Sequence, residues 1–146
     1  MGYTKRGIMR GHRHIVFPGL VLGLSLVLIL IFQTAALAAD EGTLIDRVNQ
    51  ERQANGLAPL SYSPDLSSSA SLQAQENAGC QCASHGGQHY ASAENVAVSP
   101  SASDAFQQWL GSAQHHANML NPSYTSVGVG YASDPNGTGY YVLNFA

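Results

Sequence analysis

The sequence has 146 residues, with six lysine and arginine residues, nine aspartate and glutamate residues and two cysteines. Four of the six basic residues lie in the first 13 positions, and every acidic residue follows Ala38. After that point two arginines stand against nine acids, a net charge of −7, and there is no lysine. Such a chain lacks the basic surface that nucleic-acid binding requires, and two cysteines cannot form a disulfide framework.

The first 39 residues are organised like an export signal. A basic head precedes the apolar run Ile15–Phe32, and the A-x-A motif Ala36-Leu37-Ala38 follows. This order is typical of a secretory signal, although a run of 18 residues also approaches the length of a membrane anchor. We therefore predict a signal peptide or N-terminal membrane anchor over residues 1–39, with no other membrane contact. Residues 40–146 then form one domain that is secreted or anchored on the outer side of the cytoplasmic membrane.

Two helices are predicted first in this domain. Thr43–Asn55 has an amphipathic pattern and ends before Gly56. Its charged residues are expected largely on the solvent side: Asp46, Arg47, Glu51 and Arg52. A second helix is predicted to start after an N-cap at Ser63 and to stop at Gly79. Its packed side is expected to contain Leu66, Ala70 and Ala74, with Leu72 and Ala78 beside them.

The second half of the domain changes its period. An irregular loop over residues 79–92 leads to a short buried segment, Glu94–Val98. Helical patterns follow over Ser101–Leu110 and Ser112–Leu120. Alternation at residues 127–131, the turn residues 134–137 and the β-rich run Tyr140–Phe145 then predict an antiparallel hairpin. Helices followed by a terminal hairpin indicate an α+β domain.

The histidines after the leader form two pairs, His85 with His89 and His115 with His116. Glu94 lies between these pairs in an otherwise apolar stretch, where an unpaired buried charge would be costly. Imidazoles and a carboxylate can form a cation site or an acid–base pair. From spacing alone, the simpler interpretation is that these histidines and the glutamate are exposed on the surface.

The chain from Leu44 onward resembles the CAP (SCP-like) superfamily, which includes cysteine-rich secretory, antigen 5 and pathogenesis-related proteins. Its order of motifs is N-x-x-R-x-x-x-G-L-x-P-L, then [GA]-E-N-hydrophobic-A, then W-x-x-S-x-x-H-x-x-x-[ILM]-L-x-P and a strand. The matching stretches are Asn49–Leu60, Ala93–Ala97, Trp109–Pro122 and Val127–Tyr131. Because four motifs recur in order over roughly 100 residues, the resemblance is more specific than a single motif.

The resemblance implies a three-layer α-β-α sandwich with a shallow cleft lined by two histidines and glutamate. Glu94 corresponds to the E-N glutamate and His115 to the second-block histidine. His85 is the better match for the loop histidine, with His89 as its competitor. The second glutamate of many members is replaced here by Ser112, as in many bacterial ones.

The implied ligand-binding residues are thus His85, Glu94, Ser112 and His115. His85, Glu94 and His115 are the candidate ligands of a divalent cation, with zinc the best fit to imidazole nitrogens. A structural alternative is a Glu94–His115 hydrogen bond that ties the loop to the helix. Cys80 and Cys82 either pair with each other, which an oxidising compartment favours, or join His85 at a metal.

The resulting expectation is an exported CAP-domain binding module for small lipid, sterol or cell-envelope ligands, rather than an enzyme. The rival classes are a metal-assisted or Ser112-based hydrolase and a structural envelope protein. Ser112, His115 and Glu94 have the composition of a catalytic triad, but triads are defined by geometry.

Overall fold

The computed structural model of the chain describes residue 2 and residues 43–86 and 91–146. Apart from Gly2, the predicted leader lies outside these ranges, so the leader and the domain boundary at residue 40 stay predictions. Within the described residues, no helix is both long and apolar enough to cross a membrane.

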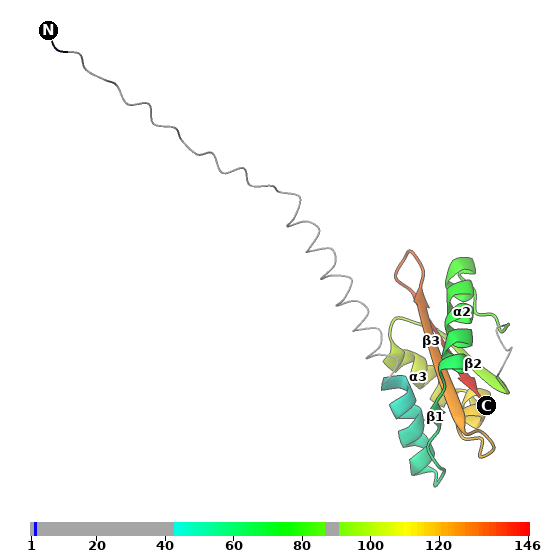
Figure 1. The fold of residues 1–146 in the computed structure, drawn as a ribbon. Coiled ribbons are helices and arrows are strands. Elements are labelled where there is room, and N and C mark those ends of the chain that lie inside the picture. The colour runs from blue at the N-terminus through cyan, green and yellow to red at the C-terminus, as the bar shows by residue number, and fades with distance from the viewer. Residues whose placement is uncertain (1, 3–42, 87–90) are drawn as a thin grey trace. The chain divides into compact units, whose positions relative to one another are not determined.

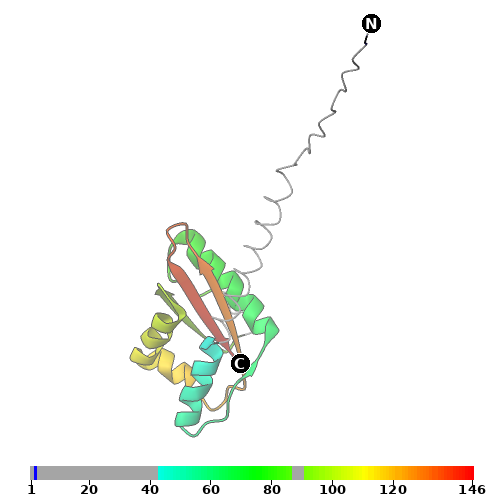
Figure 2. The ribbon, with the colours of Figure 1, turned by 90° about the vertical axis from the view of Figure 1, so that its left-hand side faces the viewer.

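The described chain forms helices on both faces of a four-stranded mixed sheet (Figures 1 and 2). The elements are a helix over residues 43–54, β1 Ser61–Tyr62, α2 Pro64–Cys80, β2 Ala93–Ser99, α3 Ala102–Gly111, α4 Ala113–Met119, β3 Ser126–Ser133 and β4 Gly139–Phe145. The strand order is β1-β3-β4-β2, with β1 parallel to β3 and the other pairs antiparallel. The predicted α+β class and the C-terminal hairpin are confirmed.

The pleat of the sheet separates two packed layers. Val127 and Val129 point into the larger core, whereas Gly128 and Gly130 lie against α2. Figure 2 shows α2 on one side of β3 and β4, and the other helices on the opposite side. The larger core includes Leu44, Val48, Leu60, Phe106, Trp109, Met119, Tyr141, Leu143 and Phe145. The core under α2 is formed by Ala70, Ala74, Val96 and Val142.

The helix α2 approaches β3 closely because both partners present small residues. A Cβ atom on Gly128 would overlap the backbone of Leu66 and Ser67, and one on Gly130 would overlap the backbone at Ala70. The Ser67 hydroxyl adds a polar contact by accepting a hydrogen bond from the N–H of Val129 (3.0 Å). The alternating glycines of β3 are therefore required by helix–sheet packing.

Most predicted helix boundaries agree with the structure. Ser63 caps α2 with Pro64 in the first turn, Ser101 caps α3, and Gly56 follows the first helix with a positive φ of 74°. The predicted stop at Gly79 is wrong by a short distance, since α2 runs to Cys80 and ends at Gln81 in the left-handed region. Gly79 itself does not adopt a positive φ, so it continues the helix.

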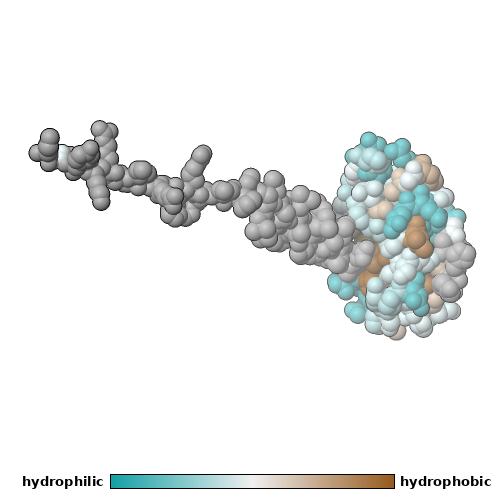
Figure 3. All heavy atoms as spheres, turned by 45° about the horizontal axis from the view of Figure 1, so that its top comes forward, coloured by the Kyte–Doolittle hydropathy of each residue, from teal (hydrophilic) through white to brown (hydrophobic). Residues whose placement is uncertain are grey.

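Two side chains lie on the opposite side from the one predicted. Leu72 is 61% exposed, because two residues along a helix turn it about 200° away from the packed Ala70. Figure 3 shows that brown, apolar areas are small and separate on the face in view. Arg52 was expected in solvent but is only 2% exposed, because it shares a helix face with buried Val48, four residues earlier.

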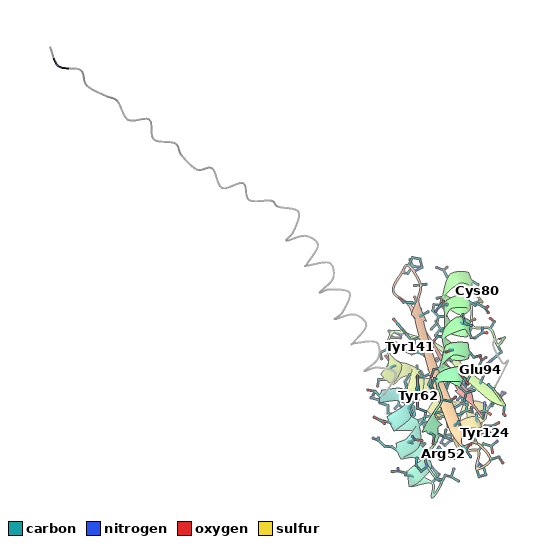
Figure 4. All side chains as sticks on the ribbon, in the orientation of Figure 1. Arg52, Tyr62, Cys80, Glu94, Tyr124 and Tyr141 are labelled. Atoms are coloured by element: carbon teal, nitrogen blue, oxygen red, sulfur yellow. A yellow bond between two sulfur atoms is a disulfide. The ribbon has the colours of Figure 1, made fainter. Side chains whose placement is uncertain are left out.

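The buried guanidinium of Arg52 connects segments distant in sequence (Figure 4). Burial lowers the pKa of Arg52, but a guanidinium stays charged in proteins. It donates to backbone carbonyls of the connector after the first helix, of the end of α4 and of the segment after α4: Ala58 (2.9 Å), Met119 (2.8 Å), Asn121 (2.9 Å) and Tyr124 (3.3 Å). These contacts hold the α4–β3 connection against the first helix.

Replacing Arg52 by methionine should therefore lower the free energy of unfolding by roughly 3 kcal/mol or more, because buried carbonyls lose their donors. Urea unfolding followed by circular dichroism measures this change. Arg47→Met is the matched control on the same helix, where the guanidinium contacts Ser103 and the Phe106 ring. It should cost about 1 kcal/mol or less, and equal losses in both variants would contradict this role of Arg52.

Gly128→Ala tests the close packing of α2 on β3. The added methyl group meets helix backbone, which cannot move aside like a flexible side chain, so we expect a loss of at least about 2 kcal/mol in unfolding free energy. Gly111→Ala, where the new Cβ meets open space, should be neutral or stabilising by up to about 1 kcal/mol. A tolerated Gly128→Ala would show that the two layers can separate at little cost.

Candidate functional site

The centre of the candidate site is Glu94, on the edge strand β2. Consecutive side chains of a strand point to opposite faces, so Glu94 lies on the α2 side while Asn95 points toward α4. The Glu94 side chain is 0% exposed. Asn144, its register partner on β4, donates to Glu94 Oε2 (3.3 Å) when its amide is oriented to satisfy its neighbours. A buried carboxylate is thus held in place by its own sheet.

The loop after α2 brings His85 to this carboxylate. His85 Nδ1 lies 2.7 Å from Glu94 Oε1, and the imidazole is 51% exposed. Because an ionised carboxylate can only accept a hydrogen bond, Nδ1–H of His85 is then the donor, and in the neutral ring Nε2 carries a free lone pair. The structure thus brings together the loop histidine and the E-N glutamate, which the resemblance places in one cleft. His89, the competing loop histidine, lies outside the described residues.

Buried side chains of α2 hold the residue before His85. Asn77 Oδ1 accepts from the Ser84 N–H (3.1 Å) and from its hydroxyl (2.7 Å). Asn77 and Gln73 both donate to the Ser84 carbonyl, at 3.1 and 2.9 Å. Nothing in the motif pattern predicted these contacts, although polar residues on the packed side of a helix are an available signal.

His115 lies on α4, and Ser112 directly precedes this helix. Ser112 is the N-cap of this helix, and its hydroxyl lies 3.5 Å from the backbone N–H of His115. The His115 ring is partly buried and has no hydrogen-bond partner within residues 43–86 and 91–146. Burial, and secondarily the charge of His85, lowers the pKa of His115 and favours a neutral ring. A neutral imidazole without a partner has a lone pair available for a ligand.

The tie between β2 and α4 uses different atoms from those expected. In place of a Glu94–His115 side-chain bond, Asn95 donates to the His115 carbonyl (2.9 Å). Asn118 in turn donates to Asn95 Oδ1 (2.9 Å). Asn95 is fully buried on β2, so the strand positions its side-chain amide. That amide in turn holds the side chain of Asn118. These bonds fix the helix that carries His115 beside the edge strand.

A second histidine–glutamate pair lies away from these residues. His116 Nε2 is 3.0 Å from Glu51 Oε1, with both side chains partly exposed. The sequence patterns gave no reason to pair them, because 65 residues separate them. Adjacent histidines on α4 therefore have different surroundings, and His116 serves as a natural comparison for His115.

Cys80 and Cys82 form a disulfide, which confirms the pairing that the sequence favours over a metal set with His85. The bridge lies at the C-terminal end of α2, around Gln81 (Figure 4). The N–H groups of Gln81 and Cys82 both point to the Asn77 carbonyl. The disulfide therefore borders the loop that carries His85.

The arrangement provides donors of metal-binding type without a closed cage. Within the described residues, no three His, Cys, Asp or Glu side chains are grouped closely enough to enclose a metal ion. Two hollows of about 490 and 310 Å³ lie elsewhere, the larger one between the first helix and Phe106 and the smaller one beside the 136–138 turn. The chemistry of the candidate site thus depends on the His85–Glu94 pair and on the neutral His115 ring.

Comparisons with known proteins agree with this fold. The model of the cysteine-rich secretory protein family, CAP, matches residues 45–145. An uncharacterised protein of Bacillus subtilis (strain 168), YkwD, is 29% identical over 113 residues, which cover 66% of this chain and 44% of that protein. The chain therefore belongs to the CAP family, as its four motifs indicated.

Solved structures with the same fold come from several bacteria. An outer surface protein from Borrelia burgdorferi matches with a TM-score of 0.66 at 16% identity, over 73% of this chain and 91% of that one. An extracellular protein containing a SCP domain, from Bacillus anthracis str. Ames, matches at 0.65 with 22% identity, over 74% and 40% of the two chains. The chain thus spans less than half the length of its two Bacillus relatives.

The burial of Glu94 predicts a pH dependence of stability. Burial raises the pKa of Glu94 above its ordinary 4.5, although the hydrogen bond and charge of His85 act in the opposite direction. A raised folded-state pKa means that this contribution to stability is complete below the unfolded pKa and is lost as the pH rises through the folded one. Glu94→Gln should remove this loss and be more stable than the wild type toward neutral pH.

Urea unfolding at a series of pH values, from below 4.5 to neutral, measures the difference. The matched control is Glu51→Gln at the partly exposed pair with His116, which should change stability by about 1 kcal/mol or less. A wild type and a Glu94→Gln variant with parallel pH profiles would show that the carboxylate is not desolvated.

Proposed function

We propose that this CAP-domain protein is an extracellular binding module with a divalent-cation site formed by His85 and His115, and that Glu94 positions His85. Zinc is the cation that two neutral imidazoles fit best. The observation that carries the proposal is the 2.7 Å contact between His85 Nδ1 and the buried Glu94 carboxylate.

This contact has the form of the carboxylate–histidine pairs that support metal ions. A carboxylate that accepts from one ring nitrogen fixes the tautomer, orients the ring and makes the other nitrogen more basic. The His85 ring is half exposed, so its Nε2 can be reached from solvent. Glu94 is buried and bonded, which suits a positioning role better than direct ligation.

His115 supplies the second nitrogen in this proposal. Edge strand β2 connects the two histidines, since Glu94 contacts the His85 ring and the adjacent Asn95 donates to the backbone of His115. The charge of His85 also contributes to the lowered pKa of His115. A low pKa keeps the ring in the neutral form that binds metal. With two protein ligands, the remaining coordination positions are left for water or for a ligand of the cell envelope.

The rival functions have less support. Ser112 Oγ lies by the backbone N–H of His115 and serves as a helix cap, so it is not activated by the ring as a hydrolase nucleophile requires. A purely structural role does not explain why the His115 ring has no partner among the described residues. Export is supported by relatives described as extracellular and outer surface proteins. A small lipid, sterol or envelope component stays the proposed ligand class, on the family resemblance alone.

Zinc titration of the purified, oxidised chain by calorimetry tests the site. We expect one ion per chain, with affinity at least tenfold weaker in His85→Ala and in His115→Ala, and a similar loss in Glu94→Gln through the misoriented ring. His12 and His14 of the leader are replaced by alanine in every protein compared, so that they do not bind the metal.

Two histidine variants serve as controls. His116→Ala, next to the site but paired with Glu51, should leave zinc affinity unchanged. His89→Ala distinguishes the competing loop histidine, and a loss there instead of in His85→Ala would reassign the ligand. Unchanged affinity in both His85→Ala and His115→Ala would refute the proposed site.

A further inference from the structure

The Cys80–Cys82 disulfide lies at the C-terminal end of α2, where the loop that carries His85 begins. Only Gln81 separates the two cysteines, so the bridge closes a very short loop and removes little entropy from the unfolded chain. Cys80 is exposed and Cys82 partly buried. Such a bridge contributes little to global stability and is accessible to thiols, and exposed disulfides are typically the labile ones.

The bridge also encloses an unusual backbone conformation. Gln81 has φ 53° and is the one non-glycine residue with positive φ among the described residues. L-residues with side chains rarely adopt this region. By joining the two neighbours of Gln81, the disulfide helps hold the chain in this reversal. The N–H groups of residues 81 and 82 then reach the Asn77 carbonyl.

A continuous set of contacts leads from this reversal to the candidate site. The chain leaves Cys82 and reaches Ser84, whose N–H and hydroxyl both bond to buried Asn77. The next residue, His85, bonds to Glu94. The position of His85 therefore depends on the short segment 82–85, which is held at Cys82 by the disulfide and at Ser84 by Asn77.

We propose that Cys80–Cys82 is a reversible thiol–disulfide exchange site, reduced by dithiols, whose state sets the position of Ser84 and His85. In the reduced form Gln81 is free to leave the left-handed region, the Asn77–Ser84 bonds weaken, and His85 is no longer held at Glu94. The consequence for cation binding rests on the proposed function, whereas the change at Ser84 does not.

The exchange step is balanced. One thiolate of the dithiol attacks the sulfur of the exposed residue Cys80, the bond to Cys82 breaks, and its electron pair leaves on the Cys82 sulfur, which takes a proton from water. The second thiolate of the dithiol then attacks the other dithiol sulfur, which is bonded to Cys80 in this mixed disulfide, and releases Cys80. The dithiol is oxidised to a disulfide, and the protein gains two electrons and two protons as two thiols. The Ser84 hydroxyl, 3.9 Å from the Cys82 sulfur, lies near the leaving group.

The first measurement is made on the native chain treated with dithiothreitol. Alkylation and mass spectrometry count the new thiols, and NMR-detected hydrogen exchange reports on the amide of Ser84. We expect complete reduction without denaturant, and Ser84 exchange at least tenfold faster in the reduced chain. The amide of Val142 in β4 should be unchanged. A bridge that resists the dithiol, or unchanged Ser84 exchange after reduction, overturns the proposal.

The second measurement uses Cys80→Ser/Cys82→Ser, which has no thiols that could bind zinc. It should show the fast Ser84 exchange of the reduced chain, with zinc affinity about tenfold weaker than the oxidised wild type. Leu72→Ser, at an exposed position of the same helix, is the control and should change neither value.

The two proposals fail in different ways. If the oxidised wild type binds no zinc, the proposed function fails, and Ser84 exchange still decides the redox inference. If zinc binds equally well to the oxidised wild type and the double serine variant, while Ser84 exchange is unchanged, the redox inference is wrong and the cation site stands.

Discussion

The charged guanidinium of Arg52, buried without a carboxylate partner among the described residues, donates to four backbone carbonyls. Three of those carbonyls belong to the end of α4 and the segment that follows it, far from Arg52 in sequence. A buried charge is tolerated only when its donors are satisfied, so the first helix and the α4–β3 connection have to meet in one arrangement. This constraint places α4, and with it His115, relative to the sheet.

The edge strand β2 connects the two halves of the candidate site. Its alternation sends Glu94 toward the loop after α2 and Asn95 toward α4. One side chain therefore positions His85, while its neighbour fixes the backbone of His115. A single E-N dipeptide at a sheet edge thus serves two layers of the domain, which gives a physical reason for its place in the family's motif.

Stability and site chemistry act in opposite directions at Glu94. Burial on the packed face of the sheet raises the pKa of the Glu94 carboxyl. The ionised carboxylate therefore lowers the stability of the folded domain. The same burial keeps the Glu94 carboxylate away from competing water, so that this carboxylate can fix the orientation of His85. An amide in its place would suit the fold better and the proposed cation site less well.

The sequence by itself determined the layered fold and much of the site. Its hydrophobic periods, caps and turn residues predicted the helices and the hairpin, because these signals are local. The E-N and histidine motifs likewise predicted Glu94 with a loop histidine. Even the burial of Arg52 had a local signal, since the residue lies one helical turn after Val48.

Only the tertiary structure decided which polar groups meet. Glu51 pairs with His116 across 65 residues, and Asn77 holds Ser84 through side chains that no short pattern relates. Ser112 became a helix cap because α4 begins immediately after it. Such contacts depend on the distance and direction between packed elements, which residue types and spacing along the chain do not contain.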